Sequence, residues 1–79
     1  MSNTEKYNEV FMKTFEIAGE QLQDLKYQDI DMWDSVGHMN LIAALEETFD
    51  IMMDTDDIID LSSFEKGKEI LSENYDIEF

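Results

Sequence analysis

Apolar side chains near the start of the chain recur every three or four residues, which is the spacing of one helix face. This pattern predicts a helix over residues 3–18. Ser2 together with Glu5, or Asn3 alone, is expected to cap its start, and Gly19 is expected to cap its end. The expected buried stripe consists of Tyr7, Val10, Phe11, Thr14, Phe15, Ile17 and Ala18.

The helical period fails over residues 20–34, where apolar residues are scattered among polar ones. A connection of this length is unusual in a small domain unless it is functional or packs its own apolar side chains. We expect the second case, a long arm held against the helices at intervals. The expected contact points are Leu22, Leu25, Tyr27, Ile30 and Trp33.

Helical spacing returns over residues 35–49. Ser35 is expected to be the N-cap, since a serine hydroxyl can accept a hydrogen bond from an unpaired amide of the first turn. The inward stripe consists of Leu41, Ile42, Leu45 and Phe49. A second apolar line on a neighbouring face consists of Val36, Met39 and Ala43. Because one stripe is enough for a core, the second line is free to cover a ligand or meet a partner.

Two further helices are predicted toward the end of the chain. Thr55 is expected to cap a short helix whose first turn carries Asp56 and Asp57, acidic residues that suit the helix dipole. Ser62 begins a capping-box pattern for a last helix over residues 64–74. The expected buried residues of these two helices are Ile58, Ile59, Leu61, Phe64, Ile70 and Leu71.

Gly67 lies inside the last predicted helix, where a glycine costs about 1 kcal/mol relative to alanine. We therefore expect a close contact between helices at this position. Residues 75–79 are expected to fray. The predicted fold is all-α: a single domain over residues 1–79, built as a small four-helix bundle with three main helices, one short helix and a long loop between the first two.

The 79 residues carry 5 Lys+Arg against 20 Asp+Glu, a formal charge of −15. An acidic surface cannot supply the cationic contacts that nucleic-acid phosphates and anionic membranes require, so binding to either is not expected. No apolar run is long enough to span a bilayer, and no signal-like segment opens the chain. Without cysteine, disulfides are excluded. We expect a cytoplasmic domain that its charge keeps monomeric.

The residues available for catalysis are few, since the chain has no Cys, no Arg and a single His. His38 follows Ser35 by three residues on the same side of the predicted helix, but a triad also requires an orienting carboxylate and an oxyanion hole. We therefore expect no enzymatic activity and a solvated His38 on the helix surface. The acidic stretches 29–34 and 54–57 lack the calcium-loop pattern, so no metal site is expected.

The acidic residues are concentrated in the middle of the chain. Between Lys26 and Lys66 there are eleven carboxylates and no cation. Such a run is often only a solubilising surface. Here it surrounds the second apolar line, so it suits docking onto basic patches of partner proteins, with an association that weakens as salt rises. The predicted docking face consists of Val36, Met39, Ala43, Glu46 and Glu47.

One arrangement of motifs spans nearly the whole chain. Asp34 and Ser35 follow a long loop and open an acidic amphipathic helix. A Leu-Glu-Glu-x-Phe stretch at residues 45–49 continues that helix, and Asp56 with Asp57 opens the short helix that precedes the last one. In order, length and charge, this arrangement resembles the phosphopantetheine attachment region of acyl carrier proteins.

The resemblance implies a covalent carrier. In that family the serine that matches Ser35 receives 4′-phosphopantetheine from coenzyme A through a separate phosphopantetheinyl transferase. The thiol of this arm then holds an acyl or aminoacyl group as a thioester, which a loading ligase supplies and downstream transferases consume. The aspartate that matches Asp34 assists by helping to place a Mg²⁺ ion in the transferase complex. A helix N-terminus suits a phosphodiester, because unpaired amides and the positive end of the dipole face it.

Two positions depart from the pattern of fatty-acid carriers, which have acidic residues where this chain has Gly37 and Asn40. The stretch from Trp33 to His38 looks more like freestanding carriers of specialised pathways, which include aminoacyl, hydroxyacyl and surface-polysaccharide routes. Gly37 also weakens the first helical turn, so we expect a mobile attachment region. The alternative function is an unmodified acidic protein-interaction module or a nucleic-acid mimic, which would bind by charge without any modification.

Overall fold

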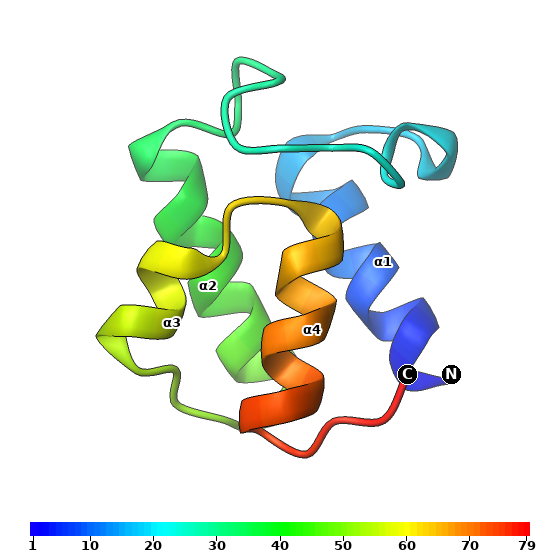
Figure 1. Cartoon of the computed structure of the whole chain (residues 1–79). Coiled ribbons are helices and arrows are strands. Elements are labelled where there is room, and N and C mark those ends of the chain that lie inside the picture. Colours follow the sequence, from blue (N-terminus) through cyan, green and yellow to red (C-terminus); the bar gives the residue numbers. More distant parts are fainter.

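The computed structural model describes residues 1–79 and is all-helical, as predicted (Figure 1). Its elements are α1 (Asn3–Phe15), the 3₁₀ turn η1 (Gly19–Gln21), α2 (Ser35–Phe49), α3 (Thr55–Asp60) and α4 (Phe64–Asn74). Three long helices and one short helix form a small bundle, and the long α1–α2 connection crosses one end of it (Figure 1). No helix has the length and apolar character needed to cross a membrane.

The helices meet in one apolar core that is rich in aromatic rings. Phe11 of α1 lies at its centre, with ring centroids 5.5 Å from Trp33 and 5.1 Å from Phe64. Tilted and edge-on pairs of this kind stabilise a fold by about 0.5–1.5 kcal/mol each beyond the area they bury. The buried core residues are Tyr7, Val10, Phe11, Phe15, Leu22, Leu25, Trp33, Leu41, Ile42, Leu45, Met53, Leu61, Phe64, Ile70, Leu71 and Ile77.

The first helix begins as predicted and ends earlier than predicted. Ser2 and Glu5 form a reciprocal capping box, in which the Ser2 hydroxyl accepts from the Glu5 amide at 3.1 Å. The last helical residue is Phe15 instead of residue 18, and Glu16, with φ 54°, takes the left-handed conformation that was expected of Gly19. The apolar pattern continues to Ala18, but the backbone there is already extended and belongs to the loop. The periodicity therefore predicted a helix that is too long at its C-terminal end.

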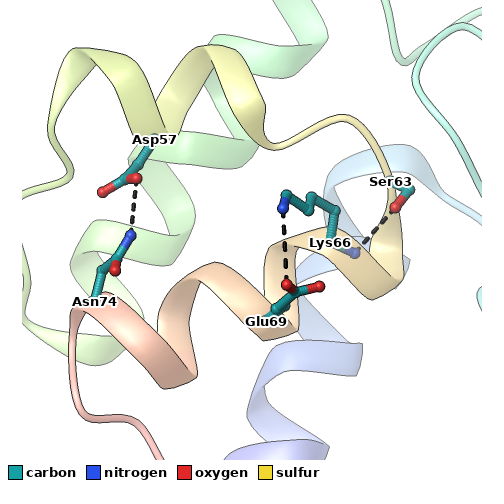
Figure 2. A network of polar contacts seen from close by, with 5 residues as sticks. All are labelled: Asp57, Ser63, Lys66, Glu69 and Asn74. Carbon is teal, nitrogen blue, oxygen red and sulfur yellow. Dashed lines mark hydrogen bonds and ion pairs between the residues drawn. The ribbon is translucent and has the colours of Figure 1, made fainter.

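The predicted caps of the last two helices are each wrong by one residue. The N-cap of α3 is Asp54 instead of Thr55, and that of α4 is Ser63 instead of Ser62. The Ser63 hydroxyl accepts from the Lys66 amide at 3.0 Å (Figure 2). In both places two neighbouring residues are good capping residues, and only the extended backbone of the true N-cap separates them.

The C-terminal residues 75–79 do not fray, which corrects the prediction. Ile77 is buried, and the Phe79 ring lies 5.3 Å from the Tyr7 ring, centroid to centroid. Asn3 at the start of α1 also donates to the Glu78 carbonyl at 3.1 Å, so the two termini lie together (Figure 1). The tail therefore closes one end of the core.

Gly67 provides the close helix contact that its position predicted. A Cβ at this position would overlap the hydroxyl of Tyr7, which donates to the Phe64 carbonyl at 2.7 Å. Burial, with a smaller contribution from the Glu65 carboxylate, holds the pKa of Tyr7 well above its ordinary value. The phenol therefore keeps its proton and ties α1 to the first turn of α4.

Replacing Gly67 should separate α1 from α4. In Gly67→Ala the new methyl group would displace the Tyr7 hydroxyl, and overpacking of this kind costs about 1–3 kcal/mol of unfolding free energy, which the gain of about 1 kcal/mol in helix propensity offsets only in part. Urea denaturation measures the loss. Gly19→Ala is the matched control, because its Cβ would meet only the Met12 sulfur at 3.5 Å, an ordinary contact. An equal effect of both substitutions would contradict the contact proposed for Gly67.

Candidate functional site

The loop between α1 and α2 is held firmly on the bundle, as its scattered apolar residues predicted. Leu22, Leu25 and Trp33 are buried and Ile30 is half-buried, whereas Tyr27, which was also expected to contact the helices, is exposed. Two backbone hydrogen bonds, both 2.9 Å long, join the loop to the start of α4 and the residues before it: the Phe64 amide donates to the Leu25 carbonyl, and the Tyr27 amide donates to the Ser62 carbonyl. The end of this loop therefore delivers the start of α2 to a fixed place.

Trp33 is the last anchor of the loop before α2. Its ring is fully buried and stacks on Phe15 at a centroid distance of 5.2 Å. The indole Nε1–H donates to Nδ1 of His38 at 2.9 Å, one turn into α2. A buried indole N–H without such a partner would be costly, so this bond fixes the loop to the helix.

His38 is not the solvated surface residue that was predicted. The imidazole is half-buried, and its Nε2 lies 2.8 Å from the Ile58 carbonyl oxygen of α3. Because Nδ1 accepts from Trp33, the ring proton of the neutral imidazole is on Nε2, which donates to Ile58. Neither nitrogen is free to take a proton from Ser35, so the Ser–His pair considered above is not assembled.

Gly37 has a packing role that the sequence did not reveal. It is buried in the first turn of α2, and a Cβ there would overlap the carbonyl group of Met32 in the loop. Only glycine lets the loop backbone cross so near the helix. This contact explains why a glycine stands at position 37. It does not test the mobility expected of the attachment region, which stays a prediction.

Asp34, and not Ser35, is the N-cap of α2. Its Oδ1 accepts from the Gly37 amide at 2.8 Å, while its other carboxylate oxygen takes no hydrogen bond from the chain. Ser35 is the first helical residue, and its hydroxyl takes no part in the hydrogen bonds around it. Because the aspartate does the capping, the exposed serine hydroxyl is left free.

Ser35 borders an apolar groove between α2 and α3. The groove has a volume of about 370 Å³ and is open to solvent along one side. Its walls come from the α1–α2 loop, from α2, and from α3 with the residues that follow it. The lining residues are Tyr27, Ser35, His38, Met39, Ile58, Ile59, Leu61 and Ser62.

Most of the predicted docking face is exposed. Val36 and Met39 have exposed fractions of 71% and 54%, and Ala43 and Glu47 are also exposed. Glu46 differs, because its Oε2 accepts from the Met53 amide at 2.9 Å. That carboxylate holds the chain after α2, so it is only partly available to a partner.

Two further apolar residues extend this surface and were missed. Ile59 was predicted to be buried but is 71% exposed, and Met32 at the end of the loop is 44% exposed. Neighbouring residues of a helix point in different directions, so Ile58 and Ile59 could not both face the core. That spacing was the available signal for Ile59; nothing in the sequence marked Met32.

No group of three or more His, Cys, Asp or Glu side chains is placed to hold a metal ion. No protein-family model matches the chain, and comparisons with the curated proteins and with the solved structures also found no match. What this surface does must therefore be inferred from Ser35, Asp34 and the groove themselves.

The capping role of Asp34 is open to a direct test. Asp34→Ala removes the acceptor for the Gly37 amide and should lower the unfolding free energy by about 1 kcal/mol. Asp34→Asn keeps a good capping oxygen, so its unfolding free energy should fall much less. Urea denaturation of both variants measures the difference. Equal losses would show that the carboxylate does not act as a cap.

Proposed function

We propose that the protein is a freestanding acyl or aminoacyl carrier, modified on Ser35 with 4′-phosphopantetheine. The observation that carries the proposal is the exposed Ser35 hydroxyl at the start of α2, free of hydrogen bonds, next to an aspartate that caps the helix in its place. Once bound, the arm supplies a thiol, which the chain itself lacks because it has no cysteine.

The modification is a phosphoryl transfer to a serine oxygen. Ser35 Oγ forms a bond to the phosphorus that bears pantetheine in coenzyme A, and the bond from that phosphorus to the adenosine bisphosphate breaks. The hydroxyl proton leaves to a base of the transferase. The Oγ atom needs only to be accessible and unpaired, and Ser35 meets both conditions.

The surroundings of Ser35 fit a phosphodiester and an extended arm. At the start of α2 the Gly37 amide is taken by Asp34, while the amides of Ser35 and Val36 have no intrahelical partner. Unpaired amides and the positive end of a helix dipole favour a negative phosphate there. The groove beside Ser35 offers the arm a mainly apolar wall on the side of α3.

Asp34 has a second proposed role as the helper in cofactor transfer. One carboxylate oxygen is occupied with the Gly37 amide, and the other is free to meet a Mg²⁺ ion in the transferase complex. Carboxylate oxygens are the ligands that this ion prefers. Capping and ion placement thus use different oxygens of one side chain.

The proposed partners dock on the exposed face of α2. Val36, Met39 and Ala43 provide apolar contacts, and Glu47 with the nearby acidic residues provides charge for basic patches on a transferase, a loading ligase and downstream enzymes. The strong like charge favours a monomer. The proposed arm ends in a free thiol, which a reducing compartment keeps from forming disulfides, so the proposed location is the cytoplasm.

An unmodified acidic interaction module is the second candidate. It is favoured by the formal charge of −15 and by a polar groove at the far end of α3, lined by Asp54, Asp56, Asp57 and Glu73. Such a module, or a nucleic-acid mimic, would bind basic sites through charge alone. It would not need the free hydroxyl of Ser35.

Modification of Ser35 distinguishes the two functions. After incubation with coenzyme A, Mg²⁺ and a broad-specificity phosphopantetheinyl transferase, intact-mass measurement should show the gain of one phosphopantetheine. Ser35→Ala should keep its helical content, because the hydroxyl makes no hydrogen bond, and should gain no mass. Ser62→Ala, which changes another serine of the same groove, should be modified normally. Continued modification of Ser35→Ala, or none of the folded wild type, would refute the carrier.

Docking through charge predicts a salt-dependent effect of Glu47. Glu47→Lys should slow modification several-fold at low ionic strength, and the difference should shrink as salt is added, because rim charges act mainly on the association rate. Glu73→Lys makes the same change in net charge near the end of α4, away from Ser35, and should modify at the wild-type rate. Equal slowing in both variants would mean that net charge, and not this face, controls docking.

A further inference from the structure

The short helix α3 contributes no fully buried side chain to the core. No residue within Thr55–Asp60 is buried, and Ile58 is half-buried. The first fully buried side chain after Asp54 is Leu61, which follows the helix. A helix of this length is marginal unless other elements hold it, so its position depends on the contacts at its two ends.

The first end of α3 is joined to α4 by a polar network. The Asp57 carboxylate accepts from Asn74 Nδ2 at 2.9 Å (Figure 2) and from the Tyr75 hydroxyl at 2.7 Å. The same hydroxyl accepts from the Asp54 amide at 2.8 Å. Burial, together with the two nearby carboxylates, raises the pKa of Tyr75, so the phenol stays protonated and able to donate.

The C-terminal end of α3 is joined to α2 by a single side-chain hydrogen bond, which comes from His38. The Ile58 carbonyl belongs to the last turn of α3, where carbonyls have no intrahelical partner. His38 Nε2 donates to it at 2.8 Å. Trp33 holds the imidazole in the tautomer that donates, because its indole N–H occupies Nδ1.

We propose that His38 is the positioning residue that holds α3 against α2 and so sets the width of the groove beside Ser35. The bond from His38 crosses directly between the two walls of this groove, since His38 and Ile58 both line it. The consequence for the carried group rests on the proposed carrier function. An acyl or aminoacyl group that the arm brings into the groove would contact the α3 side of it, whose position His38 sets. The relay runs from the loop through Trp33 to His38 and then to α3.

Amide hydrogen exchange of the unmodified protein tests this inference. His38→Met keeps about the same side-chain length but loses both the donor to Ile58 and the acceptor of the Trp33 indole, so exchange at the Ile58 and Leu61 amides should become at least about fivefold faster, which corresponds to the loss of one hydrogen bond. His38→Gln keeps an N–H that can reach the Ile58 carbonyl, so protection of α3 should be largely restored. Asn40→Ala, an exposed polar position on the same helix, is the control and should change neither amide.

The Ile59 methyl resonances report on the groove itself, because Ile59 lines it without taking part in the relay. They should shift in His38→Met and return toward wild type in His38→Gln. Unchanged exchange at α3 in His38→Met, or an equal rise in α1 and α3, would overturn the inference. Because the protein is unmodified, a failure of Ser35 modification would leave this result standing, and the reverse also holds.

Discussion

The hydrogen bond from the Trp33 indole to His38 is the interaction on which the region around Ser35 depends. A long irregular loop can end in many places, and here a fully buried ring stacked on Phe15 fixes its last residues. The indole N–H cannot be left unpaired in that environment without a cost of about 1–3 kcal/mol, so the first turn of α2 must present an acceptor. The loop end and the helix start are thereby placed together.

The chemistry proposed for the protein follows from that placement. Asp34 comes directly after Trp33 and turns the chain into α2 by capping the Gly37 amide, which leaves the hydroxyl of Ser35 unpaired and exposed. The same histidine that accepts from Trp33 reaches across to α3 and borders the groove. A single relay thus sets the position of the Ser35 hydroxyl and of the surface beside it.

Much of the fold could be predicted from local spacing, because each long helix carries a regular apolar stripe that a single window of sequence contains. The capping residues were harder to predict. Asp34 and Ser35 are both residue types that cap helices well, and only the backbone conformation decides which of them is the N-cap. His38 was misjudged because one of its partners lies twenty residues further along the chain. The tail was misjudged for the same reason, since Phe79 meets Tyr7 at the opposite end of the sequence.

The placement of the helix start is tested most directly by the nitrogen–nitrogen scalar coupling across the Trp33–His38 hydrogen bond, measured by NMR on ¹⁵N-labelled protein. The chain has one Trp and a single His, so the two side-chain resonances are unambiguous. Our account predicts a correlation between Trp33 Nε1 and His38 Nδ1, with an indole proton that exchanges slowly with water. An indole proton that exchanges as fast as that of a free indole, with no correlation, would contradict it.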